Sequence, residues 1–160
     1  MSENPIIGFQ VDPADIQYIG EDLQRPECIL AEKDGTLWSA DARGGVVCIA
    51  PDGIAFDAFG NLWGTLVMVD QVFAITPEGD FHVILDDTNQ EPARDLEQAF
   101  VEDRVTPDDM LAAGGTIAPW FASVTFGGPD LTTAYIGSLR GTRIPFFRSP
   151  VAGLPMVHWG

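Results

Sequence analysis

Short apolar runs alternate with turns rich in Gly, Pro and Asp along most of the chain. Runs of about four to eight apolar residues are typical of β-strands and too short for most helices. Asp34-Gly35 and Phe59-Gly60-Asn61 are typical of hairpin turns, because Gly and Asn accept a positive φ angle. The pattern therefore predicts an all-β protein with antiparallel sheets.

The segment from Pro26 to Gly79 repeats itself. Gly35-Thr36-Leu37-Trp38 recurs as Gly60-Asn61-Leu62-Trp63, and at the same spacing Pro26-Glu27 recurs as Pro51-Asp52. Repeated antiparallel units of this size predict β-propeller blades arranged around a channel. Glu27 and Asp52 then open the innermost strands of two successive blades and face the channel mouth, where two carboxylates could bind a hard cation.

The strands are expected in three groups. The first comprises 29–31, 36–41 and 46–50, the second 54–56, 62–69, 71–76 and 81–85, and the third 122–126, 133–138 and a final strand near 151–159. Residues 1–14 are expected to form a loose arm. Trp38, Trp63 and Tyr135 occupy related positions and are interpreted as packing residues of the three groups.

An acidic insertion, residues 87–114, interrupts the β pattern within a single domain that spans 1–160. It contains two predicted helices, at 92–101 and 107–113. Thr106 is a good N-cap for the second helix, with Pro107 at the first helical position and Gly114 after its end. We expect this insertion to cover a surface rather than to form a site.

Three stretches carry a resemblance to a known family. They are Arg25-Pro-Glu-Cys-Ile-Leu-Ala-Glu-Lys-Asp-Gly-Thr-Leu-Trp-Ser-Ala-Asp41, Pro51-Asp-Gly-Ile-Ala-Phe-Asp-Ala-Phe-Gly-Asn-Leu-Trp63 and Phe126-Gly-Gly-Pro-Asp-Leu-Thr-Thr-Ala-Tyr-Ile136. They resemble the SMP-30/gluconolactonase/regucalcin family of six-bladed propellers. The resemblance implies metal-dependent hydrolysis of a small-molecule lactone, and an N-terminal strand at 15–19 that completes the last blade.

The resemblance also implies a metal site. Family members hold one divalent ion with a Glu, an Asn and an Asp. Glu27 matches the Glu, and Asp52 matches the Asp, which is also the general base. The family's Asn has no counterpart here, and Ala122 holds the third equivalent position in the blade alignment. Calcium is the first choice of cation, with zinc, manganese, magnesium and iron as alternatives.

The length of 160 residues has room for about three blades of 40–45 residues. The middle blades of the family are missing, with the join at Ala50-Pro51-Asp52-Gly53, and the sequence leaves open whether the loss is natural or engineered. The predicted fold is therefore an all-β partial propeller with a short helical insertion. Two copies related by a two-fold axis would restore six blades, so a homodimer is predicted. An irregular association through the incomplete first blade is the alternative.

The net charge of −16, from 24 acidic and 8 basic residues, excludes nucleic acid as a partner, because binding phosphate needs a basic face. The chain shows no signal-peptide pattern and no apolar run that could span a bilayer, so we expect no membrane partner and a cytoplasmic location. Arg140 and Arg143 lie close together near Arg148. They could bind a substrate carboxylate, or they could neutralise the acidic insertion.

Other interpretations stay open. Glu27 could be a solvated loop acid, and Asp52 an ordinary Pro-Asp-Gly turn residue. His82 and His158 lack zinc-ligand spacing, and Cys28 and Cys48 form no disulfide framework. The alternatives to a lactonase are a cation-binding half-propeller without turnover and a truncated structural relic.

Overall fold

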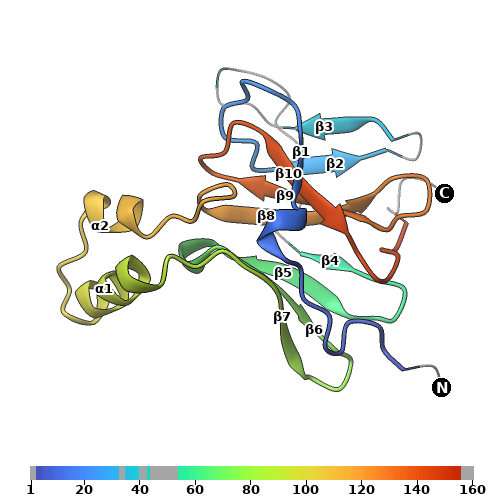
Figure 1. Ribbon diagram of the computed structural model, residues 1–160, viewed down its shortest axis with the longest axis horizontal. Helices are drawn as coiled ribbons and strands as arrows, with labels where there is room; N and C mark the ends of the chain where they lie inside the picture. Colours follow the sequence, from blue (N-terminus) through green and yellow to red (C-terminus); the bar gives the residue numbers. More distant parts are fainter. Residues whose placement is uncertain (1–2, 33–34, 40–42, 44–53, 156–160) are drawn as a thin grey trace.

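The computed structural model describes residues 3–32, 35–39, 43 and 54–155. In this part of the chain, most regular structure is antiparallel β-sheet, with two short helices at one end (Figure 1), which confirms the predicted class.

The strands form three sheets. The central sheet has the order β1 (Gln17–Ile19), β10 (Ile144–Arg148), β9 (Thr133–Ser138) and β8 (Phe121–Gly127). The second sheet pairs β2 (Ile29–Ala31) with β3 (Leu37–Ser39). The third contains β4 (Ala55–Phe56), β5 (Leu62–Leu66), β6 (Gln71–Ile75) and β7 (Phe81–Asp86) in sequence order. Short 3₁₀ turns occur at Pro13–Asp15 and Val67–Val69.

The three sheets stack face to face. The central sheet lies between the β2–β3 sheet and the β4–β7 sheet (Figure 1), and its strand β8 contacts both neighbours. The hairpin turns follow the sequence prediction, since Gly35 and Gly60 have φ angles of 92° and 84°. The described strands of the first two predicted groups agree with the prediction to within a few residues.

The central sheet joins the two ends of the chain. β1 pairs with β10 in antiparallel register, with Tyr18 opposite Pro145, so the N-terminal strand completes this sheet as expected. The predicted final strand near 151–159 does not form in its described part, residues 151–155, and its remaining residues lie outside the described ranges. The third consecutive strand is β10, and Gly153 makes only an isolated bridge to Asp57. The sequence analysis assigned no strand to Ile144–Arg148, but its apolar side chains are largely buried in the central sheet.

The N-terminal arm is not loose in the part that the structure describes. Ile6 is fully buried, and Val11 is buried beside β7, where its N–H donates to the carbonyl of Ile84. Asn4 and Asn61 exchange two side-chain hydrogen bonds of 2.6 and 3.1 Å. The prediction failed because the few apolar residues of the arm are spaced irregularly, without the period of a strand or a helix.

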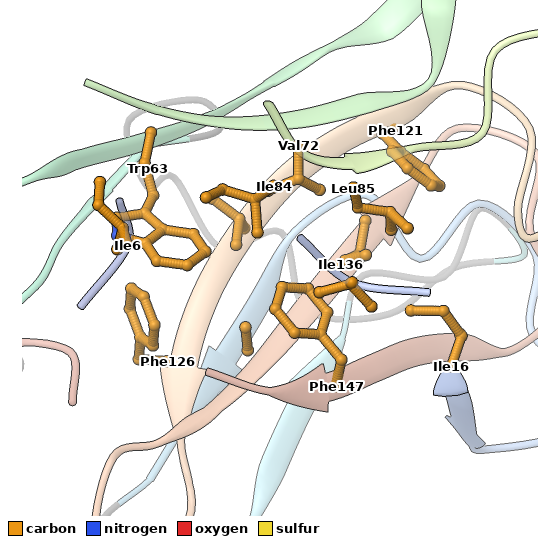
Figure 2. Close-up of a cluster of buried hydrophobic side chains, with 14 of the residues drawn as sticks. Ile6, Ile16, Trp63, Val72, Ile84, Leu85, Phe121, Phe126, Ile136 and Phe147 are labelled. Atoms are coloured by element: carbon orange, nitrogen blue, oxygen red, sulfur yellow. The ribbon is translucent and has the colours of Figure 1, made fainter. Parts of the chain in front are cut away.

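The main core lies between the central sheet and the β4–β7 sheet (Figure 2). Trp63 is fully buried there, and its ring meets Phe126 edge to face at 5.2 Å and stacks on Phe147 at 6.5 Å. This confirms the packing role of Trp63. Trp38, the matching residue of the first repeat, is 52% exposed and packs into no core of the described chain.

A buried carboxylate holds Trp63 in place. Asp57 is fully buried, and its Oδ2 accepts hydrogen bonds from the Trp63 indole at 2.8 Å and from the Asn61 amide at 2.7 Å. Its Oδ1 accepts the backbone N–H groups of Phe59 and Asn61. A buried charge is tolerated when it is fully hydrogen-bonded, and these bonds tie the turn before β5 to the core.

The helical insertion consists of α1 (Gln90–Val101) and α2 (Pro107–Ala112). Thr106 caps α2 as predicted, and a reciprocal bond from the Thr106 N–H to the Asp109 carboxylate completes a capping box. Leu96 and Ala99 are the buried residues of α1. Among the described residues, no helix has the length and apolar character to cross a membrane.

Replacing Asp57 with Ala should lower the free energy of unfolding by about 2–4 kcal/mol, because the buried Trp63 and Asn61 donors lose their acceptor. Asp80→Ala is the matched control, since Asp80 is an exposed turn residue whose loss should change stability by less than about 0.5 kcal/mol. Urea denaturation followed by circular dichroism measures both. Equal effects of the two substitutions would contradict the role assigned to Asp57.

Candidate functional site

Several loops meet at one end of the three sheets, beside the start of β2. The Pro26 carbonyl accepts the backbone N–H of Ser138 at 2.9 Å, and the Trp120 carbonyl accepts that of Leu139. These bonds connect the segment before β2 to the start of β8 and the end of β9. The predicted site residue Glu27 lies at this junction.

The backbone of Glu27 is held against the central sheet. Its carbonyl oxygen accepts the Ser123 hydroxyl at 2.6 Å. A Cβ at Gly137 would lie 2.1 Å from that oxygen, so only glycine permits this approach. Gly127, at the end of β8, likewise allows β2 to approach closely, because a Cβ there would lie 2.5 Å from the Ala31 methyl group. Two glycines of the central sheet therefore set the position of β2 and of Glu27.

The Glu27 carboxylate forms an ion pair with Arg25 at 2.5 Å. The Glu27 side chain is 33% exposed and the Arg25 side chain 57% exposed. Both groups are thus accessible to a ligand, and the ion pair is worth little in stability because water screens it. Arg25 is also held in the left-handed region, with a φ angle of 55°.

A hollow of about 460 Å³ opens next to this ion pair. Its lining comprises Leu23, Gln24, Arg25, Trp120, Leu139, Arg140, Gly141 and Thr142. Arg140 lies over the Trp120 ring, with 5.3 Å between the guanidinium carbon and the ring centroid. We call this space the arginine hollow, because two of the eight basic residues of the chain line it.

The walls of the arginine hollow are fixed by a buried serine and a strained tryptophan. The Ser138 hydroxyl donates to the Pro119 carbonyl and accepts the N–H groups of Arg140 and Gly141. Trp120 has a φ angle of 67°, and its indole N–H donates to the Met110 carbonyl of α2. Left-handed geometry costs about 1–2 kcal/mol for such a residue, and strain of this kind is often found at functional sites.

The structure separates the two arginines that the sequence had grouped as substrate-binding residues. Arg140 lines the hollow, whereas Arg143 lies over the Tyr18 ring at 4.2 Å and is not among the lining residues. Arg148 pairs with Asp130 in the β8–β9 turn. Asp52, the predicted ligand and general base, lies outside the described residues.

Two acidic residues that the sequence analysis did not single out, the buried Asp70 and the half-buried Asp87, anchor the helical insertion beside the hollow. Asp70 is fully buried and accepts the backbone N–H groups of Gly115 at 2.6 Å and Phe121 at 2.8 Å. Asp87 accepts the Ile117 N–H at 2.7 Å and the Thr116 hydroxyl at 2.9 Å. The two carboxylates therefore hold the loop that leads from α2 into β8.

The protonation of Asp70 depends on its surroundings. Burial raises the pKa of the Asp70 carboxyl above its ordinary value, while the backbone N–H groups bonded to it act in the opposite direction. The nearby carboxylate of Asp87 adds to the rise. Asp70 has a left-handed backbone, with a φ angle of 48°, and no Gly in the sequence signals this turn.

The donor set for a metal ion is incomplete in the described part of the chain. No group of three or more His, Cys, Asp or Glu side chains in these ranges could hold a metal ion. Glu27 is the one predicted ligand that is described, and Arg25 engages its carboxylate. The described residues alone therefore do not complete a metal site, because Asp52, the other predicted ligand, lies outside them.

Compared with known proteins, the chain matches no family model and no curated protein sequence.

Asp70→Asn should change how stability depends on pH. A carboxyl whose pKa is raised on folding contributes stability that is fully present below its unfolded-state pKa of about 4 and is lost as the pH rises through the folded-state value. The advantage of the wild type over the variant should therefore shrink as the pH rises from about 4 towards neutrality.

Urea denaturation at a series of pH values measures this difference. Asp95→Asn, at an exposed position of α1, is the control and should show no such trend. A wild-type advantage that grows with pH would contradict the raised pKa of Asp70.

Proposed function

We propose that the protein is a lactone hydrolase similar to the SMP-30/gluconolactonase/regucalcin family, and that its site lies at the arginine hollow. The observation that supports this proposal is the position of Glu27, whose backbone is locked to the central sheet beside a hollow lined by Arg25 and Arg140. Further support comes from the N-terminal strand that completes the central sheet, as the resemblance implied. We propose that the sheets are part of a β-propeller.

The hollow suits the chemistry of lactone opening. Attack of water on a lactone carbonyl creates negative charge on oxygen, and the product is a hydroxy acid whose carboxylate is an anion. Guanidinium groups stabilise such charge by charge-assisted hydrogen bonds. We assign Arg140 to the carboxyl end of the product, with Trp120 holding its guanidinium in place through their stacking contact.

Glu27 and Asp52 remain the proposed ligands of a divalent cation, with calcium as the first choice. Carboxylate oxygens are the ligands that hard cations prefer. When bound, such an ion would polarise the lactone carbonyl and activate water. Arg25 competes with it for the Glu27 carboxylate, so cation binding requires that this ion pair opens.

The second candidate is a binding protein without turnover. The missing counterpart of the family's Asn favours it, because the ligand set of the hydrolases that the chain resembles is incomplete here. Hydrolysis measured by pH-stat, with and without added calcium, zinc or manganese, separates the two functions. Turnover supports the hydrolase, and cation binding by calorimetry without turnover supports the alternative.

Glu27→Gln and Asp52→Ala should each lower metal-dependent lactone hydrolysis at least about tenfold, the effect of disturbing even the supporting residues of a metal site. Glu78→Gln is the matched control, since Glu78 is an exposed acid in the β6–β7 turn, away from the hollow. Full turnover in both site variants, with intact circular dichroism, would remove these carboxylates from the mechanism.

Arg140→Gln should weaken competitive inhibition by the hydroxy-acid product by about 10–100-fold, because a hydrogen bond to a charged group is worth about 1.5–3 kcal/mol. Arg148→Gln is the control, because Arg148 pairs with Asp130 at the opposite end of β10. Inhibition constants from initial rates measure both. Equal inhibition of wild type and Arg140→Gln would place the carboxylate elsewhere.

A further inference from the structure

The β4–β7 sheet has a second face, turned away from the central sheet. Trp63, Val72 and Ala74 are buried on the side that faces the central sheet. Side chains alternate along strands, so the residues next to each of them in the sequence point to the other side. One cross-strand row consists of Phe56, Leu62, Ile75 and Phe81, and the next of Gly64, Phe73 and Val83. Ile54, two residues before Phe56, shares the face by the same alternation. We call these residues the open face.

The open face is apolar and accessible. Phe56 is 50% exposed and Phe81 53% exposed, and the Phe81 ring stacks on Phe73 at 5.2 Å. No residue of the two rows carries a charge, although the chain as a whole has a net charge of −16. Contiguous apolar patches of this kind mark interaction surfaces in soluble domains.

The other end of the stack carries a matching apolar surface. Ile29 and Ala31 are buried on the side of the β2–β3 sheet that faces the central sheet. Their neighbour Leu30 is paired with Trp38, so both side chains lie on the opposite side. Trp38 is 52% exposed there.

Both apolar surfaces belong to one chain, at the two ends of one stack. The central sheet is covered on both of its faces by sheets of this same chain, so face-to-face packing of these sheets is already its mode of assembly. We infer that a second copy of the chain continues the stack, with the Leu30 and Trp38 surface of each copy against the open face of the other. Closure as a dimer requires that the stack curve until both end surfaces of one chain meet the same partner, and the two contacts are then related by a two-fold axis.

Area favours a second copy. The net charge of −16 on each chain opposes association in general, and contact through rows that contain no charged residue adds least to this repulsion. The exposed halves of Phe56, Phe81 and Trp38 amount to roughly 200–400 Å² per chain, since an aromatic side chain offers about 150–250 Å². Together with their half-buried neighbours, they approach the roughly 800 Å² per partner of a standard interface.

This inference does not depend on the proposed function, because neither surface contains Glu27 or a residue of the arginine hollow. Absence of lactonase activity would therefore not contradict the dimer, and a monomeric mass would not contradict the proposed hydrolase.

Light scattering coupled to size-exclusion chromatography tests it. The wild type should have the mass of a dimer at micromolar concentration, and Phe81→Asp and Trp38→Asp should each shift the mass to that of a monomer. Phe100→Asp is the matched control, because Phe100 is 77% exposed on α1, outside both surfaces, and this variant should stay dimeric. Far-UV circular dichroism checks that each variant is folded. If Phe81→Asp is unfolded, the milder Phe81→Ser replaces it in the same measurement.

Mixing the two monomeric variants tests the pairing itself. A heterodimer of Phe81→Asp with Trp38→Asp keeps one intact contact, so an equimolar mixture should show more dimer than either variant alone. A monomeric wild type overturns the inference, as does a dimer that survives Phe81→Asp or dissociates in Phe100→Asp. A dimer broken by Phe81→Asp but not by Trp38→Asp overturns the proposed pairing, because the open faces would then meet each other.

Discussion

The bond between the buried Asp57 carboxylate and the Trp63 indole is the interaction on which the rest of the structure depends. The acidic side chain lies inside the core, which is tolerated because both of its oxygens are hydrogen-bonded. It also fixes the indole where it contacts Phe126 and Phe147 of the central sheet. One polar network thus sets both the turn before β5 and the distance between two sheets.

The opposite side of the central sheet relies on close backbone approach. Gly127 and Gly137 let β2 lie against the sheet with little side-chain material between them, and the carbonyl of Glu27 is bonded there directly. The central sheet therefore has one face that packs through aromatic rings and one that packs through glycines. This asymmetry brings Glu27 within reach of the loops at the ends of β8 and β9.

The arginine hollow follows from the way these loops are held. Ser138 bonds three neighbouring backbone groups, and Asp70 and Asp87 bind the loop that precedes β8. Trp120, with its positive φ angle, lies between these contacts, and Arg25 and Arg140 both line one space in an acidic protein. Such preorganisation would suit the carboxylate recognition that we propose for this hollow.

The sequence by itself determined the all-β class, the hairpins at Gly35 and Gly60, the capped helix after Thr106 and the N-terminal strand of the central sheet. These features follow from local periodicity, turn chemistry and the resemblance of the repeats. Tertiary structure alone decided the burial of Ile6, the strand at Ile144–Arg148, and the difference in exposure between Trp38 and Trp63. Those outcomes depend on which faces meet, and a local pattern carries no information on that. The arginine hollow is likewise invisible in the sequence, because Arg25, Trp120 and Arg140 are far apart along the chain and meet only through bonds between loops.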